Sequence, residues 1–349
     1  MKLTVFRVDA GPMIGGGHVV RCLALASAFV STGWRCAFAC AKGTVETIPA
    51  LAHSGHELLE LENDEIADPS ALVRRWPAGT DLFVVDHYGL GHRFEARSRP
   101  WARQILVIDD RPSRRHDADA LLDQTPGRQM SDYFGLVSSN CDLLLGPRFA
   151  LLRPQFAAAR AAALARRNAT CRLSRVLISL GAVDAANVTA VVLGGVRATG
   201  LALDVDVVLG ATAPHRVTLA ERMAPRVRIH IDPDVDGLVD LMIQADVAVG
   251  AAGGSAWERC CLGLPSLVLV VADNQQTNAD ALRQAGAAAV VDPDSRDPMT
   301  TTKEMLRMLA SEKGLLADMG CRAANICDGG GASRTANALN AVMNALPVG

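Results

Sequence analysis

A glycine-rich turn that ends in a histidine is the strongest chemical signal in the sequence. It consists of three glycines and one histidine, Gly15, Gly16, Gly17 and His18. Glycines let the backbone approach a ligand closely because they carry no Cβ atom, and the helix-like run that follows offers free N–H groups to an anion. Because the positive end of a helix disfavours an imidazolium, we expect His18 to be neutral and able to accept a proton.

This turn matches neither of two common phosphate-binding motifs. His18 interrupts the G-x-G-x-x-G dinucleotide pattern, and no Gly-Lys-Ser/Thr follows as in a P-loop. A purely structural interpretation is the alternative, in which a strand-to-helix turn is capped by the histidine. We favour function because residues on loops of a rigid scaffold are disproportionately functional.

A second glycine-rich turn follows the apolar run at 247–249. Its candidate binding residues are Gly253, Gly254, Ser255 and Glu258. Backbone N–H groups and the serine hydroxyl could bind a phosphate at a helix start, and the carboxylate could accept two hydrogen bonds from a ribose diol. The structural alternative is a capping box in which Ser255 and Glu258 satisfy the helix end.

Polar side chains also follow other apolar runs. Asn274 and Gln275 come after one such run, and Asp86 and Asp109 end two others. Polar groups at the carboxyl ends of parallel strands commonly bind ligands. A solvated loop with a capping asparagine is the alternative for the amides, and each aspartate is by itself more often a helix cap than a catalytic group.

Composition excludes several classes of protein. The net charge is -2, the pI is about 6.4 and aromatic residues make up 4% of the 349 residues, which argues against a nucleic-acid partner. We expect no membrane span and no signal peptide, because apolar runs are short and charges occur early. The 9 cysteines lack paired spacing and predict free thiols in a cytoplasmic protein with no metal site.

Alternating apolar strand-like runs and helix-like runs predict two parallel α/β domains. We place the first domain at 1–155, an Ala/Arg-rich solvated helix at about 156–169 as the linker, and the second domain at 170–349. Two such halves that face one another across a cleft would form a ligand site. The strands are expected at 3–8, 35–39, 82–85, 105–108, 143–145, 176–180, 204–209, 227–230, 247–249, 267–271 and 288–291.

These motifs, taken in order, resemble one known family. They are Arg7-x-Asp9, Gly15-x-Gly17-His18-x-x-Arg21-Cys22-Leu23, Asp86-x-Tyr88, Ile108-Asp109-Asp110, Gly146-x-x-x-x-Leu151-Leu152-Arg153-x-x-Phe156, Gly253-x-Ser255-x-Trp257-Glu258 and Asn274-Gln275. The sequence is similar to the hydrolases of pseudaminic acid biosynthesis that release UDP from UDP-2,4-diacetamido-2,4,6-trideoxy-β-L-altrose. Those enzymes are related to GT-B glycosyltransferases.

The resemblance implies a GT-B-like fold of two Rossmann-like domains and an inverting, metal-independent hydrolysis with no cofactor. It implies that His18 is the catalytic base and that Tyr88 and Asn274 line the sugar site. It implies substrate binding by Gly15, Gly16, Gly17, Arg21, Gly253, Gly254, Ser255, Glu258 and Gln275. We expect a monomer whose partner is a small-molecule UDP-sugar. One departure is Ala182, where the family usually has glycine near the diphosphate.

Two other functions remain open at this level. A glycosyltransferase would use the same donor with an acceptor hydroxyl in place of water, and a binding protein would hold the nucleotide without turnover. An epimerase is the weaker alternative, because no pair of acid/base residues is clearly placed on both faces of a sugar.

Overall fold

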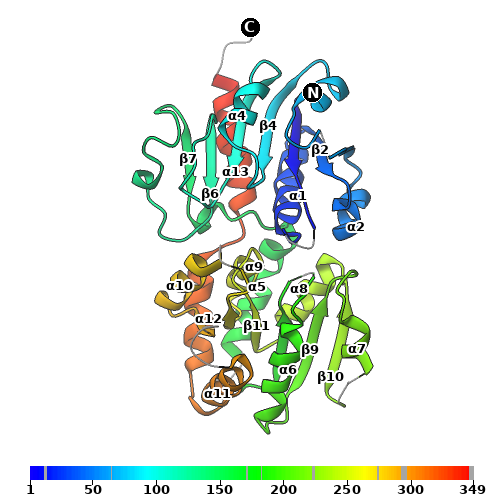
Figure 1. Ribbon diagram of the computed structural model, residues 1–349. Coiled ribbons are helices and arrows are strands. Elements are labelled where there is room, and N and C mark those ends of the chain that lie inside the picture. The colour runs from blue at the N-terminus through cyan, green and yellow to red at the C-terminus, as the bar shows by residue number, and fades with distance from the viewer. Residues whose placement is uncertain are drawn as a thin grey trace. The chain divides into compact units, whose positions relative to one another are not determined.

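The computed structural model describes residues 1–11, 14–63, 65–169, 172–181, 183–221, 225–272, 275–291 and 297–345. The chain forms two compact units (Figure 1). The first unit contains Met1–Arg153 together with Gly330–Gly349, and the second contains Pro154–Gly329. Each unit has one parallel sheet with helices on its faces.

The first unit is built on a seven-stranded sheet of order β3-β2-β1-β4-β5-β6-β7, in which every pair is parallel. Most of its strands are short and apolar, as expected for strands covered on both faces. The strands are β1 (Leu3–Val8), β2 (Arg35–Ala41), β3 (Glu57–Leu61), β4 (Thr80–Asp86), β5 (Ala102–Ile108), β6 (Ala120–Asp123) and β7 (Asp142–Leu145).

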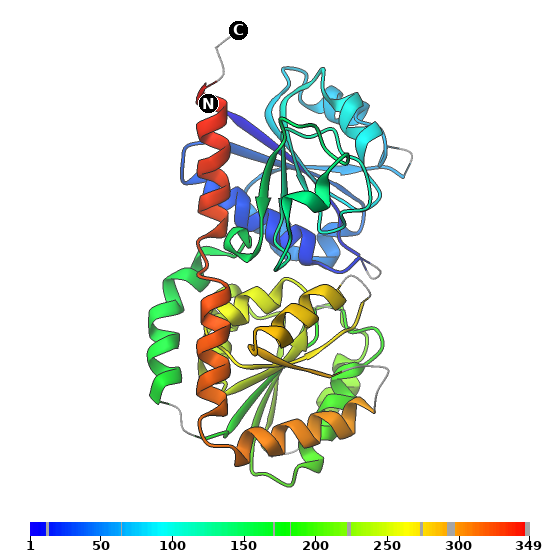
Figure 2. The same ribbon diagram turned by 90° about the vertical axis from the view of Figure 1, so that its left-hand side faces the viewer.

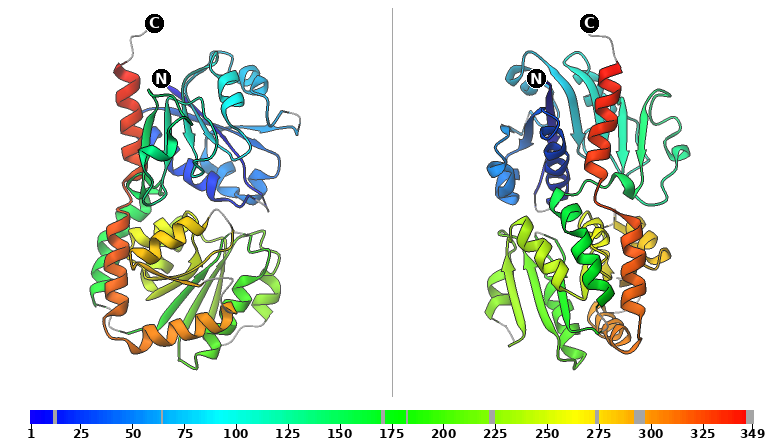
Figure 3. Two further views of the ribbon diagram at one scale, coloured as in Figure 1. Left: turned by 60° about the vertical axis from the view of Figure 1, so that its left-hand side comes forward. Right: turned by 180° about the vertical axis from the view of Figure 1, so that it is seen from behind.

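Helices cover both faces of this sheet. The α-helices are α1 (Gly17–Val30), α2 (Thr44–Thr47), α3 (Ser70–Arg75), α4 (His92–Ser98) and α13 (Gly331–Ala345), and the 3-10 helices are η1 (Pro49–Ser54), η2 (Met130–Tyr133) and η3 (Pro147–Phe149). Helices α1 and α13 pack against one face (Figure 3), where Phe6 and Val84 are buried. Helices α3 and α4 pack on the other, where Val5 and Phe83 are buried. The two-residue alternation of strands explains this division.

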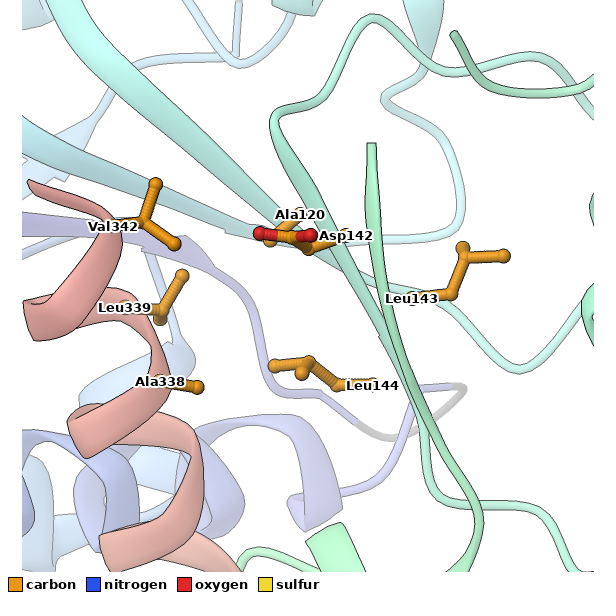
Figure 4. Close-up of a pocket in the computed structure, with 7 residues that line it drawn as sticks. All are labelled: Ala120, Asp142, Leu143, Leu144, Ala338, Leu339 and Val342. Atoms are coloured by element: carbon orange, nitrogen blue, oxygen red, sulfur yellow. The ribbon is translucent and has the colours of Figure 1, made fainter. Parts of the chain in front are cut away.

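The last helix, α13, corrects the expected domain boundaries. The expectation placed 330–349 in the second domain, whereas these residues belong to the first unit. The reason is an apolar stripe on α13, including Ala336 and Leu339, that completes the core beside α1. Trp34 also donates a hydrogen bond from Nε1 to Oδ1 of Asn340, at 2.9 Å. A hollow of about 250 Å³ remains where α13 meets β6 and β7 (Figure 4).

The second unit has a six-stranded sheet of order β10-β9-β8-β11-β12-β13, again parallel throughout. Its strands are β8 (Arg175–Ser179), β9 (Asp204–Leu209), β10 (Val227–Ile231), β11 (Val247–Ala251), β12 (Ser266–Leu269) and β13 (Ala288–Val291). Its helices are α5 (Pro154–Ala169), α6 (Val188–Ala198), α7 (Arg216–Glu221), α8 (Val235–Gln244), α9 (Ser255–Cys261), α10 (Gln276–Gln284), α11 (Pro298–Ser311) and α12 (Leu315–Ile326).

The Ala/Arg-rich helix α5 is a packed part of the second unit, which corrects the expectation of a solvated linker. It lies beside α12 (Figure 2). Phe156 and Ala163 are fully buried. The arginines bind main-chain carbonyls, since Arg160 donates to the carbonyl oxygens of Cys261, Cys327 and Ala324. Cations are favourable at such helix ends because the carbonyls there lack partners.

Strand order reverses once in each sheet. In the first unit the reversal lies between β1 and β4, and in the second between β8 and β11. In sheets of this kind ligands bind beyond the carboxyl ends of the strands at such a reversal. Both glycine-rich turns follow a strand that flanks a reversal, β1 and β11 respectively.

The described part of the chain contains no helix that combines the length and the apolar character that a membrane crossing needs. Its cysteines are all free: Cys22, Cys36, Cys40, Cys260, Cys261 and Cys327 are buried, Cys141 is half-buried and Cys321 is exposed. Cys171 lies outside the described residues.

A buried histidine stabilises the first unit. The side chain of His116 is fully buried, with Nδ1 2.7 Å from Glu95 Oε1 and Nε2 2.8 Å from Asp109 Oδ2. Burial lowers the pKa of His116, but the two carboxylates outweigh burial and raise the pKa from 6.5 to about 9. The imidazolium therefore joins strand β5 to helix α4.

We predict an alkaline loss of stability from His116. Because folding raises its pKa, its contribution is complete below pH 6.5 and disappears as the pH rises through about 9. Urea unfolding at pH 6 and pH 10 should show a loss of roughly 3 kcal/mol that His116→Gln lacks. His53→Gln is the matched control, because His53 is exposed and its variant should show the same loss as the wild-type protein. Equal losses in wild type and His116→Gln would contradict the prediction.

Candidate functional site

The first glycine-rich turn brings His18 to the start of α1. Gly16 is the N-cap and His18 is the second helical residue. Gly15 has φ +76°, a conformation that side-chain-bearing residues rarely adopt. A Cβ atom on Gly16 would lie 2.2 Å from Cδ1 of Ile48, so a larger residue there would have to displace the Ile48 side chain. These constraints fix the position from which the imidazole projects.

The end of strand β4 supplies the partner of His18. Strands β1 and β4 are paired with Val8 opposite Asp86, so both strands end at the same level. His18 Nδ1 lies 2.6 Å from Asp86 Oδ1. Arg21, one turn further along α1, donates from Nε and Nη2 to the two carboxylate oxygens at 2.6 and 2.5 Å. Asp86 therefore binds two side chains of α1, a role other than the helix cap that such an aspartate more often fills.

The electrostatics of this cluster keep Asp86 ionised beside His18. Burial raises the pKa of Asp86, but the Arg21 guanidinium and His18 outweigh burial and hold that pKa well below its usual range. The ionised carboxylate can only accept a hydrogen bond, so in the neutral form of the ring the proton lies on Nδ1. The Nε2 lone pair is then available to accept a proton, as in the Asp–His pairs of hydrolases. No hydrogen bond to Nε2 from any described residue competes for it.

The sequence predicted that Arg21 binds substrate. In the structure its guanidinium donates hydrogen bonds to the Asp86 carboxylate instead. Burial lowers the pKa of Arg21, but the Asp86 carboxylate outweighs burial and raises it. Arg21 therefore neutralises Asp86 and holds it against His18. Direct contact with a substrate stays a prediction.

Tyr88 lies beside this pair. Its ring meets the His18 ring edge-on at 4.9 Å between centroids. Its hydroxyl donates to Asp110 Oδ1 at 2.8 Å, and the Arg111 guanidinium lies 3.9 Å from the ring centre. Arg114 donates a hydrogen bond from Nη1 to the main-chain carbonyl of Tyr88. Ring, hydroxyl and backbone are thus all fixed.

Another hydrogen-bonded cluster connects the end of strand β1 to the loop that carries Tyr88. It consists of Arg7, Asp9 and His87. Arg7 donates two hydrogen bonds to Asp9, at 2.5 and 3.0 Å, and His87 Nε2 lies 3.1 Å from Asp9 Oδ2. Burial raises the pKa of Asp9, but His87 and Arg7 outweigh burial and keep that pKa well below its usual range. Asp9 is therefore a structural anion between β1 and the Tyr88 loop, and the Arg7-x-Asp9 spacing was the only sequence signal for it.

The second turn gathers Gly253, Gly254, Ser255 and Glu258 at the start of α9. The helix begins at Ser255 after the N-cap Gly254, and no side chain caps it. The capping-box alternative is therefore wrong. Glu258 is buried, and Ser255 accepts a hydrogen bond from Arg259 at 3.1 Å. Arg259 was missed because an arginine inside an apolar helix gives no motif.

Gln275 braces this turn. Its Oε1 accepts hydrogen bonds from the main-chain N–H groups of Ala252 at 3.2 Å and Val271 at 3.3 Å. Asn278 adds a hydrogen bond from Nδ2 to the Ala252 carbonyl, at 3.1 Å. Two sequence expectations, for Asn274 and for Ala182, fall outside the described residues.

The predicted site residues thus form one group in each unit. His18, Arg21, Tyr88 and the first glycines come together at the β1–β4 reversal. The second glycines, Ser255, Glu258 and Gln275 come together at the end of β11. The described residues contain no group of three or more potential ligands that could hold a metal ion.

Curated relatives are distant, and no family model matches the chain. The spore coat polysaccharide biosynthesis protein SpsG of Bacillus subtilis is 26% identical over 293 residues, which cover 82% of this chain and 83% of SpsG. The UDP-2,4-diacetamido-2,4,6-trideoxy-β-L-altropyranose hydrolase of Campylobacter jejuni is 29% identical over 153 residues, or 44% of this chain and 52% of the hydrolase. An uncharacterized protein of Methanocaldococcus jannaschii is 23% identical over 77% of this chain, which spans only 55% of that protein.

Solved structures share the fold across nearly the whole chain. MurG of Acinetobacter baumannii matches with a TM-score of 0.65 and 14% identity, over 98% of this chain and 100% of MurG. The spinosyn rhamnosyltransferase SpnG matches with a TM-score of 0.64 and 16% identity, over 97% of this chain and 100% of SpnG. The protein therefore has two parallel-sheet α/β domains of the GT-B type, as the sequence predicted.

We predict that Asp86 and Arg21 are energetically coupled. Asp86→Asn leaves the Arg21 cation without its carboxylate and should cost about 3–5 kcal/mol of unfolding free energy, and Arg21→Gln should cost a similar amount. The double variant should cost clearly less than the sum. Urea unfolding measures all three.

A matched control is Glu62→Gln, which breaks the exposed ion pair between Lys42 and Glu62. It should change the unfolding free energy by less than about 1 kcal/mol. Additive costs for the Asp86 and Arg21 variants would show that the two side chains do not stabilise each other.

Proposed function

We propose that this protein hydrolyses a UDP-linked amino sugar, UDP-2,4-diacetamido-2,4,6-trideoxy-β-L-altrose, to UDP and the free sugar. His18 acts as the general base, Asp86 orients it, and Tyr88 contacts the sugar. Support comes from the geometry around His18 and from the partial similarity to the Campylobacter jejuni hydrolase.

The hydrogen bond between His18 Nδ1 and Asp86 carries the proposal. It fixes the tautomer and the orientation of the ring, which a proton acceptor needs, and the carboxylate stabilises the imidazolium that forms after proton transfer. The His18 side chain keeps 10% of its surface exposed while Asp86 keeps none. Solvent and substrate can thus reach the base but not the carboxylate.

The reaction requires one displacement. A water oxygen forms a bond to the anomeric carbon as the bond from that carbon to the diphosphate oxygen breaks, and UDP leaves with the electron pair. His18 Nε2 takes the water proton and later gives it to solvent. Attack opposite the diphosphate inverts the anomeric configuration. UDP is a good leaving group, so stabilisation of the departing diphosphate can replace a strong acid.

We assign the recognition of UDP to the second unit. Gly253, Gly254 and Ser255 would contact the diphosphate, and Glu258 would accept hydrogen bonds from the ribose. The start of α9 supports this assignment, because no side chain of the described residues caps its N-terminal N–H groups. Gln275 would hold the turn in shape rather than contact the sugar.

A glycosyltransferase is the second candidate, favoured by the fold shared with MurG and SpnG. His18 would then deprotonate an acceptor hydroxyl instead of water. Release of UDP in the absence of any acceptor separates the two functions. NMR of the products, with hydrolysis in oxygen-18 water, reports which bond breaks, since label in UDP would exclude cleavage at the anomeric carbon.

We predict that His18→Asn lowers the rate of UDP release by roughly 10²- to 10⁴-fold, the usual contribution of a positioned base. UDP affinity should stay within about twofold, because the nucleotide is assigned to other residues. The rate is measured by NMR and the affinity by calorimetry. His92→Asn is the matched control, since His92 lies exposed at the start of α4 in the same unit.

A near-normal rate in folded His18→Asn would exclude His18 as the base. UDP binding without release, in the wild-type protein and without acceptor, would favour the transferase.

A further inference from the structure

The side chain of Arg259 lies beneath the second glycine-rich turn. It starts on α9 (Figure 1), is 1% exposed, and reaches back toward the beginning of its own helix. Nη1 donates to Ser255 Oγ at 3.1 Å, Nη2 to the Ala251 carbonyl at 2.7 Å, and Nε to Ser266 Oγ at 3.0 Å. The guanidinium is thus held in one position without any ligand.

The charge of Arg259 has no counterion in the described part of the protein. All its hydrogen-bond partners are neutral, and no carboxylate there forms an ion pair with it. Burial lowers its pKa to about 10, and the nearby Cys260 and Glu258 offset this only in part. A buried cation without a counter-charge is costly.

Of the other two buried arginines among the described residues, Arg7 has a carboxylate partner and Arg167 has main-chain carbonyls. Arg7 is bound by the Asp9 carboxylate. Arg167 donates to the carbonyls of Met242 and Ala245 at the end of α8, where the helix dipole is negative. Arg259 instead points toward a helix start, where the dipole is positive and adds to the cost. Burial lowers the pKa of Arg167 to about 10 as well, so the opposite direction of the helix dipole is what distinguishes Arg259.

The backbone around the turn is shaped to admit the guanidinium. A Cβ atom on Gly250 would lie 2.6 Å from Arg259 Nη1, so only glycine leaves room there. Ser255 Oγ accepts a hydrogen bond from Arg259, so the O–H of Ser255 points away from the arginine. Ser255 is half-buried and Gly254 is exposed, so a ligand can reach this hydroxyl.

We infer that Arg259 is the counter-charge for an anion bound at the Gly253–Ser255 turn, and that it acts through the Ser255 hydroxyl. The anion is the diphosphate of a nucleoside diphosphate. This inference rests on the proposed function, and it makes Arg259 a positioning residue that the ligand itself does not touch.

This arrangement should favour an anionic ligand over a neutral one. A hydroxyl that accepts a hydrogen bond from a guanidinium is a stronger donor, because hydrogen bonds in a chain polarise one another. The low dielectric around a buried cation extends its attraction to an anion nearby. A neutral ligand gains nothing from either effect, so Arg259 should discriminate between UDP and uridine.

The test is calorimetric titration of the full-length protein with UDP, uridine and inorganic pyrophosphate. Arg259→Met keeps the length of the side chain and removes its charge. UDP and pyrophosphate affinities should fall at least tenfold, uridine affinity should stay within about twofold, and Arg259→Lys should recover part of the loss. Arg307→Met is the matched control in the same unit, because Arg307 is exposed and donates to the Thr199 carbonyl.

Ser255→Ala keeps the inference testable if Arg259→Met does not fold. It should weaken UDP about three- to tenfold without affecting uridine, and it should add little to the loss in Arg259→Met. Unchanged UDP affinity in either folded variant, or equal losses for UDP and uridine, would overturn the inference and leave the proposed function standing.

The wild-type protein separates the two proposals. If the wild-type protein binds pyrophosphate but does not bind UDP, the anion site is supported and the proposed function is contradicted. Binding of neither would overturn the anion site as well.

Discussion

The buried carboxylate of Asp86 is the constraint on which the site of the first unit depends. A carboxylate removed from water is costly unless it is paired and hydrogen-bonded, and Asp86 meets that condition with Arg21 and His18 together. Both partners come from the first turns of α1, so satisfying the charge also fixes how the helix meets strand β4. Orientation of the imidazole and attachment of the helix are therefore one interaction, and a change in either alters the other.

The two units use the same topology with opposite electrostatics. In each, a glycine turn follows a strand at the point where strand order reverses. The first turn lies beside the buried Asp86 carboxylate, which Arg21 and His18 bind. The second turn lies beside the buried Arg259 guanidinium, which has no carboxylate ion-pair partner among the described residues. The proposed proton acceptor and the proposed anion site therefore lie next to buried side chains of opposite charge.

The sequence predicted the fold class because short apolar runs and helical periodicity are local signals. It missed β3 and β6, since Glu57 and Glu60 interrupt the apolar pattern of an edge strand and Ala120–Asp123 is only four residues long. It found His18 through the neighbouring glycines. It could not find the role of Asp86, because Asp86 lies 68 residues from His18 in the chain and reaches it only through the pairing of β1 with β4. Arg259 was missed although its partners are near in the chain, because an arginine inside an apolar helix gives no motif.

The return of the chain to the first unit through α13 has a consequence for synthesis on the ribosome. The second unit is inserted between two parts of the first, so its sheet and helices are complete once residue 329 has emerged. The first unit, although its seven strands are made earlier, cannot close its core beside α1 until residues 331–345 exist, because α13 contributes Ala336 and Leu339 to that core. The helix that carries His18 therefore gains its final packing last, after the unit that carries the second glycine-rich turn is complete.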